Sequence, residues 1–108
     1  MIENNDIVVT LAKKNADHLE EKIGALNNWN EAWWIMKRIP KRNFNIIFIT
    51  CNGIINYYFT IKKKVFNPEE NLYFIYFGDY QKIKPIRMKG FQGFRYRKFN
   101  YEVIEELE

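Results

Sequence analysis

The pair Asn52-Gly53, set between two long apolar runs, is the feature that most constrains the fold of this chain. The runs extend from Phe44 to Cys51 and from Ile54 to Ile61, and both are rich in β-branched and aromatic residues. A two-residue type I′ turn needs positive φ at both central positions, and Asn-Gly meets this need with little strain. The sequence therefore predicts a β-hairpin with Asn52 and Gly53 at its tip.

The turn also predicts the register of the two strands, because a two-residue loop determines which residues face each other. The expected pairs on the buried face are Phe48 with Tyr57, Ile46 with Phe59, and Phe44 with Ile61. On the other face, Ile47 would pair with Tyr58 and Asn45 with Thr60. We expect that second, mixed face to be only partly covered.

The remaining elements follow from apolar periodicity. Residues 6–11 predict a short strand, and residues 29–36 predict a turn leading into a strand that ends before Pro40. A helix is expected between them, with Asn15 as N-cap and Asn27-Asn28 at its end. Its apolar stripe consists of Ala12, Ala16, Leu19, Ile23 and Leu26.

The second half of the chain is expected to add strands. After a turn at residues 67–71, the run from Leu72 to Phe77 predicts a strand that ends at Gly78. Residues 84–99 predict one or two further strands, and residues 101–108 a strand or a short helix. Together these elements predict one α+β domain covering residues 1–108.

Composition bounds the class of protein. The chain has 108 residues, of which 47% are hydrophobic, so a packed core rather than disorder is expected. A lone Cys51 cannot form an internal disulfide, and with His18 as the only histidine we expect no metal site and no cofactor. No apolar run approaches the roughly 20 residues that span a bilayer, and residues 1–6 lack the pattern of a signal peptide. These features predict a cytoplasmic protein with no membrane partner.

The charge is unevenly distributed along the chain. The formal net charge is +4, but residues 35–98 contain fourteen Lys or Arg against three acidic residues. Such asymmetry favours a basic face that attracts a polyanion. The alternative is that the lysines lie on strand edges and only keep the protein soluble.

The densest basic segment runs from Lys84 to Phe99 and carries Gly90 and Gly93. We expect these glycines to let the backbone turn tightly and come close to a partner, because glycine has no Cβ and tolerates positive φ. We interpret the segment as the main binding surface, because cations interleaved with aromatic rings suit single-stranded RNA. The candidate nucleic-acid-binding residues are Arg38, Arg42, Lys89, Gln92, Arg95, Tyr96, Arg97, Trp33 and Trp34. The tryptophans have an alternative role as core residues. Arg95 and Arg97 have one as ion-pair partners of Glu102 or Glu105.

The order of elements and the run from Pro85 to Tyr96, which reads Pro-Ile-Arg-Met-Lys-Gly-Phe-Gln-Gly-Phe-Arg-Tyr, resemble small members of the PUA-like superfamily, near the ASCH domains. The resemblance implies a small, curved, mixed β-barrel, or pseudobarrel, with one or two helices. It also implies binding of RNA or modified bases in a cleft beside the helical side. Catalytic relatives have a Gly-Lys-Lys-Thr-like run after the first helix; here the corresponding segment is Lys22 to Leu26, without the paired lysines or the threonine.

No catalytic motif stands out. The chain contains no serine, no phosphate-binding loop motif and no His-Glu-x-x-His motif, so catalytic residues stay unassigned. The favoured function is binding of RNA or another single-stranded nucleic acid. The alternatives are a nucleoside- or RNA-processing enzyme of the ASCH type, and a protein-interaction domain that binds no nucleic acid. The sequence leaves the oligomeric state open.

Overall fold

The computed structural model describes residues 6–12, 15–28, 31–38, 44–91, 94–96 and 101–104. These residues form one helix and six strands. In chain order the elements are β1 (Ile7–Leu11), α1 (Ala16–Asn27), β2 (Trp33–Met36), β3 (Ile46–Cys51), β4 (Ile54–Asn67), β5 (Leu72–Arg87) and β6 (Phe94–Tyr96). The predicted first strand, helix and tryptophan-containing strand are thus confirmed in position.

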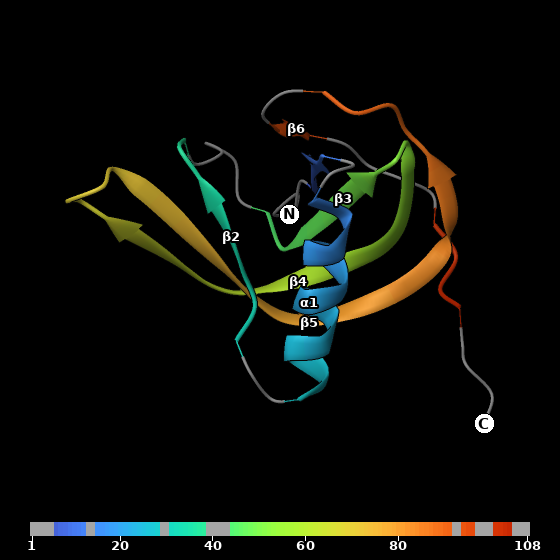
Figure 1. Cartoon of the computed structure of the whole chain (residues 1–108), viewed down its shortest axis with the longest axis horizontal. Coiled ribbons are helices and arrows are strands. Elements are labelled where there is room, and N and C mark those ends of the chain that lie inside the picture. Colours follow the sequence, from blue (N-terminus) through green and yellow to red (C-terminus); the bar gives the residue numbers. More distant parts are fainter. Residues whose placement is uncertain are drawn as a thin grey trace, which may run out of the picture.

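The six strands form one mixed sheet in the order β2-β5-β4-β3-β1-β6. β1 runs parallel to β3, and every other neighbouring pair is antiparallel. The sheet curls into a half-barrel, with α1 packed across it and the edge strands β2 and β6 towards the same end (Figure 1). This confirms the predicted α+β class and the curvature of the sheet.

The core lies mainly on the concave face of the sheet. Alternate residues of β1, such as Ile7 and Val9, join Phe59, Ile75 and other buried residues there. The helix packs against this cluster through Leu19, Ile23, Ala25 and Leu26. Leu19, Ile23 and Leu26 recur at spacings of four and three, with Ala25 beside them, so one stripe of the helix covers the apolar interior.

A smaller apolar cluster lies on the convex face. Val8, Phe48, Ile55 and Ile83 are fully buried there, and Met88 and Phe91 pack against them. The C-terminal segment covers part of this cluster. The Tyr101 ring contacts the Phe48 ring at 5.8 Å between centroids, and Val103 forms an isolated bridge with Ile83. Both faces of the central strands are therefore buried, which explains why these strands lack a simple apolar–polar alternation.

The predicted Asn52-Gly53 turn is confirmed. Asn52 has φ 56° and Gly53 has φ 76°, as a type I′ turn requires. Beside the turn, Thr50 pairs with Ile55 and Cys51 with Ile54. This is the register that the turn predicts.

Further from the turn, the predicted register is wrong. An irregularity between Phe48 and Thr50 shifts the pairing by one residue, so that Phe48 lies opposite Tyr58 and Ile47 opposite Phe59. Because side chains alternate between faces, the shift separates the residues predicted to share one face. Phe48 lies in the convex cluster and Phe59 in the concave one. Ile47, expected on a partly covered face, is fully buried.

The hairpin between β4 and β5 is longer than predicted. The lysines at 62–64 lie within β4, and Gly78 does not end β5, which continues to Arg87. Three irregularities in the β4–β5 register let these long strands bend with the half-barrel. The predicted turn at residues 67–71 is confirmed, with the Asn67 side chain accepting a hydrogen bond from the Glu69 backbone N–H at 3.0 Å and Asn71 at φ 54°.

Candidate nucleic-acid interface

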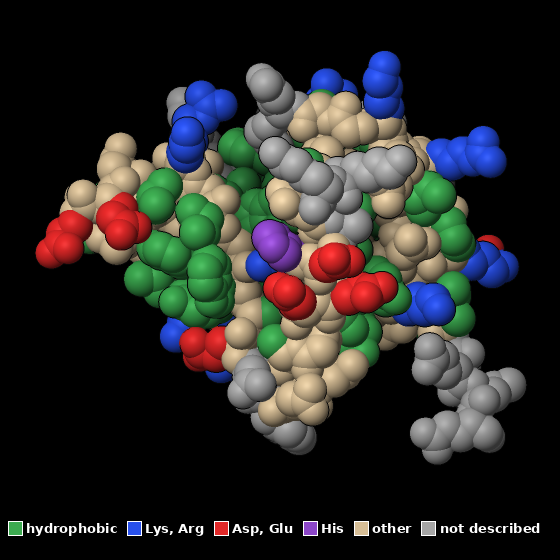
Figure 2. Space-filling view, viewed as in Figure 1, with side chains coloured by type: hydrophobic (Ala, Val, Ile, Leu, Met, Phe, Trp, Pro, Cys, Tyr) green, Lys and Arg blue, Asp and Glu red, His purple; other side chains and the backbone are tan. Residues whose placement is uncertain are grey.

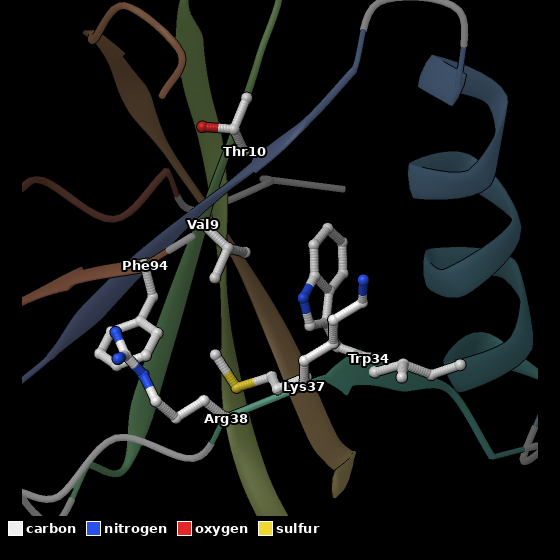
Figure 3. A pocket seen from close by; sticks show the side chains of 8 residues that line it. Val9, Thr10, Trp34, Lys37, Arg38 and Phe94 are labelled. Atoms are coloured by element: carbon white, nitrogen blue, oxygen red, sulfur yellow. The ribbon is translucent and has the colours of Figure 1, made fainter. Parts of the chain in front are cut away.

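An open pocket of about 360 Å³ lies where the two edges of the half-barrel approach each other. One wall comes from β2 and the two residues after it, and the other comes from β1 and β6 (Figure 3). The lining residues are Val9, Thr10, Trp34, Ile35, Met36, Lys37, Arg38 and Phe94. The pocket therefore exists only because the curl of the sheet brings its first and last strands together.

Strand alternation supplies the apolar part of the pocket. On β2, Trp34 and Met36 join the concave core cluster, with Met36 only 7% exposed. On the other wall, Val9 pairs directly with Phe94, so both side chains lie on the same face. The pocket thus offers the rings of Trp34 and Phe94 above a hydrophobic floor.

Two cations complete the pocket. Lys37 and Arg38 follow directly after β2, and both are exposed. These two residues follow the end of β2, so strand alternation, which turns Trp34 and Met36 inward, does not determine where their side chains point. In Figure 3 the Lys37 side chain extends beside Trp34, whereas the Arg38 side chain extends towards Phe94 on the other wall. The arrangement can hold a flat ring against apolar walls while an anionic group meets the two cations.

Charged side chains are unevenly distributed on the face shown in Figure 2. Acidic side chains gather over α1, whereas Lys and Arg side chains project from several parts of the rim, including the part above β2 and β6 (Figure 2). The cations above β2 and β6 favour the approach of an anion from that end of the half-barrel.

Trp33, the other predicted tryptophan, lies outside this pocket. Its side chain is 41% exposed and contacts the Phe74 ring edge-on, with centroids 5.7 Å apart. It lines a separate hollow with residues of α1, including His18 and Lys22. The Lys22 ammonium lies 5.5 Å from the centroid of the Trp33 ring and donates a hydrogen bond to the Trp33 carbonyl. Burial lowers the pKa of Lys22.

Gly90 has a different structural role from the one predicted for the glycines of the basic segment. Among the described glycines only Gly53 has a positive φ, so Gly90 is not required for a left-handed turn. Instead, Gly90 lets the chain pass close to β1, because a Cβ there would stand 2.8 Å from Thr10 Cγ2. The close approach that we expected towards a partner is made to the protein itself. Gly93 lies outside the described residues.

Hydrogen bonds hold this segment against the ends of β1 and β3. The Thr50 hydroxyl donates to the Met88 carbonyl at 2.6 Å, and the Phe91 N–H donates to the Thr10 hydroxyl at 3.0 Å. The Met88 N–H donates to the Gly53 carbonyl at 2.9 Å. Residues 88–91 are therefore a fixed part of the scaffold, with Lys89 exposed on it.

We expect Gly90→Ala to destabilise the fold by about 1–3 kcal/mol, the usual cost of overpacking. The new methyl group would push the Thr10 side chain out of the rotamer that accepts the Phe91 hydrogen bond. Urea denaturation measures the change in unfolding free energy. Gly24→Ala is the matched control, since a Cβ there meets nothing within 4 Å and alanine favours the helix by up to about 1 kcal/mol. Equal effects of the two substitutions would contradict the packing argument.

Two predicted site residues on β6 point in opposite directions. Tyr96 packs with Phe94 against the concave cluster, whereas Arg95 pairs with Val8 and so lies on the convex side. The Arg95 guanidinium lies 4.4 Å from the centroid of the Phe91 ring. Glu102, considered above as a partner of Arg95, instead pairs with Lys84 at 2.5 Å. This exposed contact raises the pKa of Lys84 and lowers the pKa of Glu102 through their shared hydrogen bond.

The predicted site residues thus divide into three groups. Trp34 and Arg38 line the pocket. Four others, Trp33, Lys89, Arg95 and Tyr96, are described but do not line it. Arg42, Gln92 and Arg97 lie outside the described residues. Lys37 and Phe94 line the pocket but were not among the candidates. Of these two, only Lys37 could have been found from the sequence, because it lies in the basic run from Lys37 to Arg42. The role of Phe94 depends on the pairing of β6 with β1.

Comparison of this chain with protein-family models, curated proteins and solved structures found no match. Within the described ranges, no group of three or more His, Cys, Asp or Glu residues is placed to hold a metal ion. The one helix seen in the described part of the chain is not long and apolar enough to cross a membrane.

Proposed function

We propose that this protein binds RNA or another single-stranded nucleic acid in the pocket between β2 and β6. The observation that carries the proposal is the combination of the Trp34 and Phe94 rings with the exposed cations Lys37 and Arg38 in one pocket. Aromatic rings that stack with bases and cations that neutralise phosphates are the two recurring parts of single-strand binding sites.

The size of the pocket agrees with this ligand. A volume of about 360 Å³ lies at the small end of the range for ligand pockets. It suits one unstacked base with its phosphate, whereas a base in a duplex is stacked between its neighbours and cannot enter. Arg42, Lys89 and Arg97 are proposed as further phosphate contacts, and Gln92 as a contact to a base edge, on the sequence argument alone.

The family resemblance also remains a proposal. A curled mixed sheet with one helix on its concave side supports kinship with the PUA-like superfamily, and the pocket lies near the helix-bearing face, as that kinship implies. The ASCH type of enzyme activity has no observation in its favour beyond the resemblance.

A protein-interaction role has one observation of its own. Hydrophobic side chains gather over β2 and the adjoining part of the β4–β5 hairpin (Figure 2). Trp33, Ile35 and Val65 lie on one face of these strands and are each between 41% and 43% exposed. Exposed apolar patches often mark contact surfaces. This reading gains support if the protein fails to bind nucleic acid.

Salt dependence tests the proposed function directly. A labelled oligouridylate should bind with an affinity that falls steeply as salt rises, because phosphate neutralisation releases counterions. Lys37→Ala and Arg38→Ala should each reduce the logarithmic slope by about 0.7, the value for one single-strand contact. Fluorescence anisotropy across a salt series measures both quantities.

Lys82→Ala serves as the control for these variants, since Lys82 is exposed on β5, outside the stretch from Tyr73 to Tyr76 that pairs with β2, and does not line the pocket. It removes the same charge without touching the pocket, so we expect it to reduce the logarithmic slope less than Lys37→Ala or Arg38→Ala does. Equal effects of Lys82→Ala and Arg38→Ala would refute the pocket as the binding site.

A further inference from the structure

We propose that the bound strand crosses the edge of the sheet at β6, from the pocket on the concave side to Arg95 on the convex side. The inference rests on the proposed function and names the ligand more closely as a flexible single strand of several nucleotides. It makes Arg95 a second phosphate subsite, separate from Lys37 and Arg38.

The first step is the position of β6. It spans only Phe94–Tyr96 and is the last strand in the sheet, paired with β1 on one side. In the described part of the sheet no strand lies beyond it. A short edge strand is a narrow ridge that a flexible ligand can pass over.

The second step is the alternation of side chains along β6. Phe94 lies on the face of its partner Val9, within the pocket, whereas Arg95 lies on the face of its partner Val8. Val9 and Val8 belong to different core clusters, on the concave and convex faces respectively. Adjacent residues of one strand thus present a stacking ring on one side of the ridge and a cation on the other.

The third step is the support of Arg95. Its guanidinium lies 4.4 Å from the centroid of the Phe91 ring, within the range of a cation–π contact. The backbone of Phe91 is held by the Thr10 hydroxyl, and its side chain packs against the convex cluster. The planar cation therefore rests on a fixed ring while Arg95 remains exposed. This orders the side chain before binding and lowers the entropy lost when a phosphate is bound.

The geometry selects the ligand. A single strand bends at every phosphate and can pass over a ridge one strand wide, whereas a stiff duplex cannot follow the turn. The ligand must also be longer than one nucleotide to contact both faces. We expect about four nucleotides to fill the site, the low end for single-strand-binding barrels.

The experiment compares uridine monophosphate with uridine oligonucleotides of two, four and eight residues. Intrinsic fluorescence titration or calorimetry measures each dissociation constant. For the unchanged protein, affinity should rise with length up to about four nucleotides. Arg95→Ala should leave monophosphate binding unchanged and weaken binding of the four- and eight-residue oligomers about tenfold, as expected for one lost charge-assisted contact. Arg95→Lys, which keeps the charge but loses the flat contact with Phe91, should fall between these values.

The outcomes separate the two proposals. If Arg95→Ala leaves the length dependence unchanged while Arg38→Ala weakens every ligand, the crossing is wrong and the pocket stands. Equal binding of a hairpin duplex and the single strand would also overturn the crossing. If no oligomer binds the unchanged protein, both proposals fail. Melting temperatures control for folding, and exposed Arg95 should have little effect on them.

Discussion

Phe59→Ala is expected to lower the free energy of unfolding by about 3–5 kcal/mol, the usual cost of removing a buried phenyl ring. Phe59 is fully buried in the concave cluster, and its ring stacks on Phe77 with centroids 4.5 Å apart. It also lies beside the bend of β4, between Ile47 and Tyr80. Since small domains are stable by only about 5–15 kcal/mol, the variant should be substantially destabilised, as urea denaturation will measure.

Phe66→Ala is the control for this prediction. Phe66 lies on the same strand, but it is 44% exposed, and its ring contact with Tyr73 at 4.7 Å lies at the far end of the hairpin. The loss there should be about 1 kcal/mol. A smaller effect for Phe59→Ala than for Phe66→Ala would show that the concave cluster is not the main core.

Trp34→Ala is expected to weaken binding of single-stranded RNA by about 1–3 kcal/mol, or roughly fivefold to more than a hundredfold, the range measured for base–aromatic stacking. Trp34 lines the pocket from β2, opposite the wall that carries Phe94 (Figure 3). Because the ring also packs against the core, Trp34→Phe is the gentler variant and should retain much of the affinity. Dissociation constants at one fixed salt concentration provide the measurement.

Trp33→Ala is the matched control, since Trp33 is the neighbouring residue on β2 but lies outside the pocket. It should change RNA affinity little. Stacking on a base quenches indole fluorescence, so the quench on adding RNA should persist in Trp33→Ala and disappear in Trp34→Phe. The opposite pattern would place the base at the hollow beside α1 instead.

Two regions of the sheet should respond differently to truncation of their side chains. The centre of β3 and β4 is buried on both faces, so residues such as Phe48 and Phe59 are sensitive to truncation. The end of the β4–β5 hairpin extends from the half-barrel (Figure 1) and keeps Val65 and Phe66 exposed. Its side chains should tolerate substitution unless another molecule covers them.

Local chemistry determined much of this protein from the sequence alone. The Asn52-Gly53 turn, the helix after Asn15 and the strand at Trp33 were all predicted, because turn conformation and helical periodicity depend on neighbouring residues. The concentration of cations in residues 35–98 was also visible, since charge is counted without knowing the fold.

Only the tertiary structure decided which of these residues meet. The register shift in β3–β4, the parallel pairing of β1 with β3 and the pairing of β6 with β1 are all contacts between elements. Their free energies depend on packing across both faces of a curved sheet, which no local pattern encodes. For that reason Phe94 shares one pocket with Trp34 and Arg38, although it lies far from them in the chain. Arg95, next to Phe94 in sequence, faces the other side because adjacent residues of a strand point to opposite faces.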